Sequence, residues 1–265
     1  MTERYLLAGQ LSELERLQLQ ARVWNPFGES LLASLAAELQ GARVLDVGCG
    51  ALGWLPVLSR AVGVEGEVVG TDVDRRLLSA ASAWVKAEGL ANVKLVEDDL
   101  FASGLESDFD LVHARFQLAP LGRIEEQLNA YQRLLRKDGL LVLEDPDPSS
   151  WHFNPPAEAA ERLIELILDA FSNASGDFGV GRELGQLIHD RLGAEAHITA
   201  QVLALPHGHP YLRLPLQFSA SLRPRLLQLV DETELDQLEA AAERELADPA
   251  RWGTTFTLIQ AVGRG

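Results

Sequence analysis

The stretch VLDVGCGALGWL, residues 44–55, decides how this chain folds. It begins with a short apolar run that predicts a buried strand, and Gly48, Gly50 and Gly53 follow closely. Glycine loses more backbone freedom on folding than any other residue, so a regular element disfavours it. The loop therefore indicates a place where a ligand lies against bare backbone amides. Asp46 stands at the end of the strand, just before this loop.

Composition and charge limit the class of protein. The chain has 265 residues, 47% of them hydrophobic, which is enough for one large domain with an insertion. Its formal net charge of -16 repels phosphate backbones and anionic lipid, so we expect neither a nucleic-acid nor a membrane partner. The chain has one cysteine, Cys49, and charges where a secretory signal needs an apolar core, so we expect a cytoplasmic protein.

The middle of the chain alternates between two patterns. Apolar, strand-like runs occupy 43–47, 67–71, 93–97, 109–113 and 139–144, and helical patterns occupy 52–62, 74–88 and 122–136. Buried strands that alternate with helices of this length predict βαβ units and a parallel sheet. Helical patterns also precede this region, at 11–22 and 29–40.

The rhythm changes after Asp145. The proline-rich segment 145–156 predicts a loop that leaves the sheet. Helical patterns follow at 157–172, 181–192 and 222–247, with strand candidates at 196–204 and 254–262. The leucine spacing of these helices fits either core packing or a dimer face, which leaves a homodimer open.

Acidic residues follow the first three predicted strands. The glycine loop fits G-x-G-x-x-G, and Asp72 follows the second glycine by 22 positions, a pattern also typical of dinucleotide binding. Asp46 would repel a pyrophosphate packed against the loop, however, and it suits a cation instead. Asp98 and Asp99 close the third strand, where a carboxylate can accept a hydrogen bond from an exocyclic amine. Together these residues describe a site for a positively charged nucleoside.

The motifs that carry these residues resemble those of class I S-adenosylmethionine-dependent methyltransferases. They are DVGCG (46–50), VVGTDVD with Asp72, VEDDL (96–100), FDLVHAR (109–115) and LRKDGLLVLED (135–145). The resemblance covers roughly residues 40–145 and departs at Leu52, where the family usually has its third glycine. It implies a Rossmann-like α/β fold, with a seven-stranded, mostly parallel sheet whose last strand is antiparallel. The cofactor would be S-adenosyl-L-methionine, with S-adenosyl-L-homocysteine as product.

The resemblance implies a set of cofactor-binding residues at the carboxyl ends of the strands. These are Asp46, Gly48, Cys49 and Gly50 at the methionine portion, Asp72 at the ribose hydroxyls, Asp99 and Leu100 at the adenine, and Ala114 and Arg115 at the amino-acid end. Asp74 and Asp98 remain alternatives to Asp72 and Asp99.

The expected organisation has three parts. Residues 1–40 would form helices over the cofactor site, where Arg22 and Trp24 either contact the cofactor or cover the sheet edge. Residues 41–150 would form the cofactor-binding core. Residues 151–265 would supply an inserted helical cap around the substrate, built from 157–192 and 222–247, and the last strands of the sheet.

His152 is the preferred candidate for a general base, because its loop should hang over the methyl donor. A loop histidine without a catalytic role is the alternative. We expect no metal site. His207 and His209 lack a nearby carboxylate or cysteine, and His113-Ala114-Arg115 stands where catechol-type methyltransferases carry acidic metal ligands.

The sequence therefore predicts metal-independent, in-line methyl transfer to a small organic molecule such as a secondary metabolite. Two other functions remain: a non-catalytic or catalytically different S-adenosylmethionine-binding protein, and an NAD-dependent oxidoreductase that uses the same glycine motif. The acceptor, the atom methylated and the oligomeric state stay open.

Overall fold

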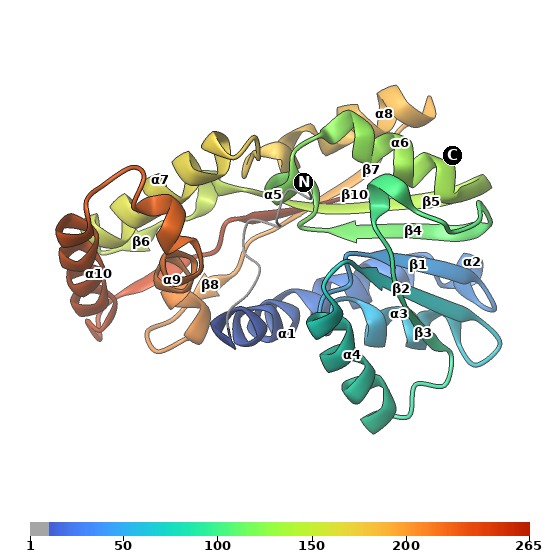
Figure 1. The fold of residues 1–265 in the computed structure, drawn as a ribbon, viewed down its shortest axis with the longest axis horizontal. Coiled ribbons are helices and arrows are strands. Elements are labelled where there is room, and N and C mark those ends of the chain that lie inside the picture. The colour runs from blue at the N-terminus through green and yellow to red at the C-terminus, as the bar shows by residue number, and fades with distance from the viewer. Residues whose placement is uncertain (1–10) are drawn as a thin grey trace.

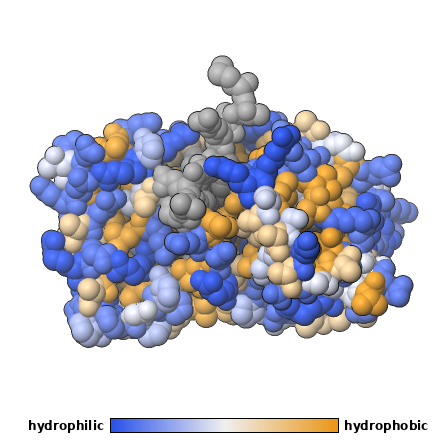
Figure 2. Space-filling view, turned by 60° about the horizontal axis from the view of Figure 1, so that its bottom comes forward, coloured by the Kyte–Doolittle hydropathy of each residue, from blue (hydrophilic) through white to orange (hydrophobic). Residues whose placement is uncertain are grey.

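The structure is a computed structural model that describes residues 11–265, and their side chains from residue 14 onward. The first ten residues of the expected N-terminal helical segment thus lie outside the described residues. Within the described range, no helix is both long and apolar enough to cross a membrane. On the face of the molecule that Figure 2 shows, hydrophobic residues lie among hydrophilic ones.

A seven-stranded sheet with the order β3-β2-β1-β4-β5-β10-β7 forms the centre of the molecule (Figure 1). Neighbouring strands are parallel except β10, which is antiparallel to both β5 and β7. This confirms the predicted Rossmann-like fold with an antiparallel last strand. The strands are β1 (Arg43–Val47), β2 (Glu67–Asp72), β3 (Val93–Glu97), β4 (Phe109–Arg115), β5 (Leu135–Asp147), β7 (His197–Gln201) and β10 (Thr257–Arg264).

Helices cover both faces of the sheet because its central strands are apolar on both sides. In β1, Val44 packs in one core with the helices α3 (Leu55–Val62) and α4 (Arg75–Ala87). Its neighbour Leu45 packs in the opposite core, against α6 (Ile124–Leu134) and α8 (Leu184–Leu192). Figure 1 shows the two layers on opposite sides of the strands. The short helix α2 (Ala36–Leu39) packs in the same core as α3, and the short helix α5 (Leu118–Leu121) packs in the same core as α6.

A cap with its own apolar core stands beyond one end of the sheet. It consists of α1 (Leu11–Ser34), α7 (Glu158–Asn173), α9 (Leu214–Leu226) and α10 (Glu232–Leu246). A three-stranded sheet, β6 (Phe153–Asn154), β9 (Trp252–Thr254) and β8 (Ala204–Leu205), completes it.

The cap differs from the predicted one in four respects. The expected helix 222–247 is two helices, α9 and α10, and α8 belongs to the sheet layer rather than to the cap. The expected helices 11–22 and 29–40 are largely one continuous helix, α1, which contains Pro26. The small sheet was not predicted, because strands of two or three residues are too short to show a periodic pattern.

Gly28 in α1 should be essential for the contact between α1 and the sheet layer. A Cβ atom at Gly28 would lie 2.8 Å from Cε2 of Trp54. Trp54 is fully buried and stacks on His113 with ring centroids 3.7 Å apart, so it has little room to move aside. We expect Gly28→Ala to lower the free energy of unfolding in urea, since overpacking costs roughly 1–3 kcal/mol. That cost outweighs the gain in helix propensity of about 1 kcal/mol.

Gly185→Ala in α8 is the matched control. The nearest atom to its new methyl group would be Cδ1 of Ile198, the end of a flexible side chain that is 50% exposed. This variant should be neutral or more stable by up to about 1 kcal/mol. Equal stability changes in the two variants would contradict the proposed contact between Gly28 and Trp54.

Candidate active site

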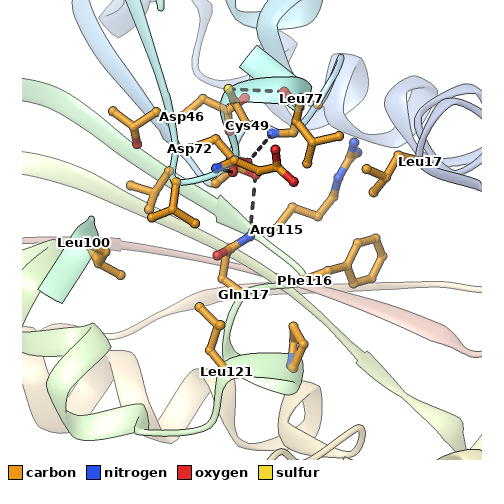
Figure 3. A pocket seen from close by; sticks show the side chains of 18 of the residues that line it. Leu17, Asp46, Cys49, Asp72, Leu77, Leu100, Arg115, Phe116, Gln117 and Leu121 are labelled. Carbon is orange, nitrogen blue, oxygen red and sulfur yellow. Dashed lines mark hydrogen bonds between the residues drawn. The ribbon is translucent and has the colours of Figure 1, made fainter. Parts of the chain in front are cut away.

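A cavity of about 1370 Å³ opens at the carboxyl ends of β1, β2, β3 and β4 (Figure 3). Strand order reverses here, because β1 lies between β2 and β4, and such a switch point is where doubly wound sheets bind ligands. The cavity brings together nearly all the predicted cofactor-binding residues: Asp46, Gly48, Cys49, Gly50, Asp72, Asp99, Leu100 and Arg115.

The glycine loop adopts backbone conformations that favour glycine. Gly48 and Gly50 both have φ of 61°, and Gly53 has φ of 42°. A Cβ atom at Gly53 would collide with the carbonyl oxygen of Cys49, so Gly53 provides the close approach that Leu52 in the family's usual glycine position cannot. At Gly50 a Cβ atom would meet only Leu17, at 3.8 Å, so the backbone there faces the cavity.

Asp72 and Asp74 both line the cavity but have different partners. Asp72 accepts hydrogen bonds from the amides of Gly50, at 3.0 Å, and Asp74, at 2.8 Å. Burial raises the pKa of the Asp72 carboxyl. Asp74 caps α4 by accepting from the amide of Arg76 at 2.8 Å, and it also pairs with the Arg76 guanidinium. Asp72 is thus fixed to the glycine loop, whereas Asp74 is fixed to a helix.

Asp98 and Asp99 also reach the cavity. Asp99 caps the short helix at Leu100–Ala102, accepting from the amide of Phe101 at 3.0 Å, whereas Asp98 accepts from the amide of Gly104 at 3.2 Å. The Arg123 guanidinium lies over the Phe101 ring at 3.7 Å. Carboxylates therefore stand at the carboxyl end of each of the first three strands, as the sequence predicted.

A buried polar chain connects the site to the rest of the sheet. Oδ1 of Asp46 lies 2.7 Å from Nδ1 of His113, whose Nε2 lies 3.2 Å from Oε2 of Glu144. Gln260 donates to Oε1 of Glu144 at 2.5 Å, and Thr199 donates to Gln260 at 3.0 Å. We call these five residues the polar chain.

Both carboxylate oxygens of Asp46 are used inside the protein. Besides its contact with His113, Asp46 accepts a hydrogen bond from the amide of Trp54 at 3.2 Å through Oδ2. Its side chain is only 3% exposed. Asp46 therefore shapes the end of the glycine loop, in addition to supplying a negative charge near the cavity.

His113 lies between two carboxylates, which favour its protonated form. Its burial alone would lower the pKa of the imidazole, but the hydrogen bonds to Asp46 and Glu144 outweigh burial and raise the pKa. Arg115 follows it on β4, with Nε 3.8 Å from Oε2 of Glu144. Two cations therefore balance the two buried carboxylates.

Three consecutive residues after His113 and Ala114 contribute to the cavity: Arg115, Phe116 and Gln117. The Arg115 side chain is 5% exposed and points toward Leu17, and its Nη1 has no hydrogen-bond acceptor among the described residues. Phe116 has φ of 54°, which is unusual for a residue with a side chain. Gln117 lies over the glycine loop, with Nε2 3.5 Å from the carbonyl oxygen of Gly48.

Two predicted site residues lie elsewhere. Ala114 is fully buried in the core beneath the cavity and does not line it. His152 is exposed, and its Nε2 lies 3.1 Å from the carbonyl oxygen of Ser149. Like Ala114, it does not line the cavity. The segment around it is extended, so Trp151 and Phe153 point into the cap core and His152 points outward. The structure therefore gives no support to His152 as a base.

The remaining candidates, Arg22, Trp24 and His209, do not line the cavity. Trp24 is fully buried in the cap and donates to the Tyr211 hydroxyl at 2.9 Å, and neither it nor Arg22 lines the cavity. His209 accepts from the amide of Tyr211 at 3.1 Å. Within residues 11–265, no three potential metal ligands of the His, Cys, Asp or Glu type come together.

Sequence reasoning missed the residues that reach the cavity from the cap. Leu17 and Gln20 come from α1, Asn173 from the end of α7, and Arg225 from α9. Nothing in their local sequence distinguishes them, because their position depends on how the cap packs. Phe116 and Gln117 could have been found, since they directly follow a strand that ends at the site.

The fold and the row of carboxylates define an α/β protein that binds a nucleoside at the switch point of its sheet. A family model described as "Methyltransferase domain" matches residues 38–199, more than half of the chain. The chain therefore belongs to this family, the class I S-adenosylmethionine-dependent methyltransferases, whose cofactor is S-adenosylmethionine.

Curated relatives that match the chain are also methyltransferases by name. The chain is 35% identical over 116 residues to the demethylmenaquinone methyltransferase of Geobacillus kaustophilus, a match that covers 43% of this chain and 50% of the relative. It is 30% identical over 132 residues to the enzyme of that name from Staphylococcus carnosus, covering 49% of this chain and 52% of the relative. The chain thus matches about half the length of these curated relatives.

Among solved structures, a SAM dependent methyltransferase from Aquifex aeolicus is similar in fold. It superposes with a TM-score of 0.54 at 22% identity and covers 74% of this chain and 93% of the other. At this identity the similarity establishes the fold alone.

The charge on His113 should make stability depend on pH. Because its pKa in the folded protein is raised above 6.5, its contribution to stability is complete below pH 6.5 and is lost as the pH rises through the raised value. Glu144→Gln removes one of the two carboxylates that raise the pKa of His113, so the loss should be smaller and should be complete at a lower pH. Urea unfolding between pH 6 and 9, with NMR titration of His113, measures both. Identical pH slopes in the two proteins would contradict a cationic His113.

Proposed function

We propose that this protein transfers a methyl group from S-adenosylmethionine to a small organic molecule. The observation that carries the proposal is the position of Asp72, whose carboxylate binds the amide of Gly50 at 3.0 Å on the floor of a large cavity. This contact fixes a carboxylate beside backbone that is open to a ligand. The chain's residues fit the cofactor in three places.

The first place is the nucleoside. Asp72 would accept hydrogen bonds from the two ribose hydroxyls, while Asp74 stays occupied as the cap of α4. Asp99 and the amide of Leu100 would contact the adenine edge, because Asp99 lies at the mouth of the cavity and is exposed. The aromatic and guanidinium groups of Phe101 and Arg123 stack beside this position.

The second place is the amino-acid end. Gly48, Cys49 and Gly50 present backbone there, and a side chain at Gly48 would collide with the Gln117 side chain. Arg115 would hold the cofactor's carboxylate, since its Nη1 lacks an acceptor among the described residues. A charged donor left without a partner in a buried position is costly, so a carboxylate that reached it would stabilise the complex.

The third place is the positive charge of the cofactor. Asp46 would act on it mainly through its field, because His113 and the amide of Trp54 occupy its oxygens. In a partly buried site such a field is stronger than in water.

The cofactor supplies a methyl group on a sulfonium, which a nucleophile displaces in line. The chain's part is to align the acceptor and exclude water, and alignment of this kind can contribute about 7–11 kcal/mol. Leu17 and Phe116 would provide apolar walls on the acceptor side, and Leu121 adds apolar surface to the same cavity. The proposal needs no metal ion, since the residues after β4 offer no acidic ligands.

The names of the relatives suggest which acceptors to try first. A demethylmenaquinone-like molecule is one class, and secondary metabolites of similar size are another. His113 is the cavity's histidine, but both of its nitrogens are occupied by carboxylates. We therefore favour an acceptor that reacts without a strong general base.

Replacement of Asp72 tests the cofactor assignment. We expect Asp72→Ala to weaken binding of S-adenosylhomocysteine by roughly 10- to 100-fold, because hydrogen bonds to a charged group contribute about 1.5–3 kcal/mol. Asp74→Ala is the control and should keep its affinity while losing stability of about 1 kcal/mol from the lost helix cap. Isothermal titration with S-adenosylmethionine, S-adenosylhomocysteine and NAD measures this. Binding of NAD alone would refute the proposed function.

Replacement of His152 tests the absence of a loop base. Loss of a general base lowers turnover by about 10²- to 10⁴-fold. Because His152 points away from the cavity, we expect His152→Ala to keep the wild-type rate of S-adenosylhomocysteine release with any active acceptor. A 100-fold loss without a change in cofactor affinity would restore His152 as the base.

A further inference from the structure

The cavity has two ends with different chemistry. Of the five carboxylates that line it, Asp72, Asp74, Asp98 and Asp99 end or follow β2 and β3, around the proposed nucleoside position, and the fifth, Asp46, is already bonded to His113 and the amide of Trp54. Leu17 and Phe116 lie on the other side of the loop from Asp46, as Figure 3 shows. Arg225 reaches the same cavity from the cap helix α9. Because α9 packs beside α1, the helix that carries Leu17, the side of the cavity that the cap forms combines apolar residues with an arginine.

Arg225 differs from the other arginines of the cavity. Four of the five pair with a carboxylate: Arg75 with Glu97, Arg76 with Asp74, Arg115 with Glu144 and Arg123 with Glu126. The side chain of Arg225 makes no hydrogen bond or ion pair with any residue of the described range, 11–265. The chain has 39 acidic and 23 basic residues, so carboxylates are abundant and an arginine that faces a cavity without one is unusual.

The neighbouring Arg223 makes the contrast clear. It lies two residues earlier on the same helix and pairs with Glu232, Asp236 and Glu239 of α10. The two side chains therefore point in different directions. Arg223 joins two helices of the cap, whereas the half-buried Arg225 faces the cavity.

A guanidinium in such a position is suited to bind an anion. Its planar group of donors matches a carboxylate or phosphate in a two-pronged hydrogen bond, and partial burial strengthens the attraction. Four carboxylates of the cavity belong to the nucleoside end, and Asp46 is bonded to His113 and the amide of Trp54, so the carboxylates compete little for it. Apolar side chains nearby would accept the uncharged part of the same molecule.

We propose that the methyl acceptor carries an anionic group, a carboxylate or a phosphate monoester, and that Arg225 binds it. Leu17, Phe116 and Leu121 contact the apolar part of the molecule, so the acceptor is a small apolar acid. This inference rests on the proposed function, because it assigns the second substrate of the same cavity.

The experiment first separates the cofactor from the acceptor. S-adenosylhomocysteine is titrated into the wild type, Arg225→Gln and Arg225→Lys, and equal affinities are expected, since the proposal assigns Arg225 to the acceptor. If the wild type fails to bind, the proposed function itself fails. A loss of S-adenosylhomocysteine binding in Arg225→Gln alone would place Arg225 at the cofactor and overturn the anion site.

The complex with S-adenosylhomocysteine is then titrated with matched aromatic probes. These are hydroxybenzoates and hydroxynaphthoates, their methyl esters, and the corresponding aryl phosphates, with binding followed by ligand-observed NMR. We expect at least one anionic class to bind tenfold or more tightly than the neutral esters, and the tighter class identifies the anion. Arg225→Gln should abolish this preference, and Arg225→Lys should keep part of it, because the charge remains while the two-pronged geometry is lost.

Arg223→Gln is the control on the same helix. It removes the same charge and breaks contacts to α10, yet it should keep the preference for anions. Raising the salt concentration should weaken the anionic probes and leave the esters unchanged. Equal binding of acids and esters, no binding of either anionic class, or an unchanged preference in Arg225→Gln would each overturn the proposal.

Discussion

The buried ion pairs at Asp46, His113 and Glu144 are the constraint on which the rest of the site depends. Two carboxylates and an imidazolium have been removed from water, and such charges persist only when they are paired and hydrogen-bonded. Asp46 lies opposite His113 between β1 and β4, and Gln260 lies opposite both Glu144 and Thr199. The polar chain therefore crosses five strands on one face of the sheet. Its hydrogen bonds can form only when these strands keep their register.

The glycine loop inherits its shape from this constraint. Oδ2 of Asp46 holds the amide of Trp54, and the Trp54 ring lies on the His113 ring at an interplanar angle of 11°. The loop is thus anchored at both ends, by β1 before it and by the Trp54 contact after it. Gly53 bends the backbone between these anchors, and the amide of Gly50 is left free to bind Asp72. Asp46, which the sequence analysis associates with a cationic ligand, therefore also holds the glycine loop in its conformation.

The sequence predicted the parts of the fold that have a period and missed those that depend on packing. The short apolar runs of strands such as β1, their alternation with helical patterns and the order of the motifs were enough for the sheet and for the carboxylates at its edge. The helix boundaries of the cap were harder to predict. Leucines and acidic residues continue across the break between α9 and α10, and Pro26 lies inside a continuous α1 instead of ending it. His152 is exposed because side chains alternate in direction along the extended segment Trp151–Phe153. The sequence analysis treated this segment as a loop and did not apply the alternation.

The cap and the cofactor site meet at Phe116, which explains how distant segments can form one cavity. Phe116 packs against the cap core, with its ring 5.7 Å from that of Phe256, while its backbone follows β4. Its left-handed φ of 54° carries a cost of order 1–3 kcal/mol, which must be offset by surrounding packing. Phe256 also contacts the rings of Trp24 and Trp151. The aromatic core of the cap thus holds the residue between Arg115 and Gln117 in place, and through it sets where an acceptor can lie relative to the glycine loop.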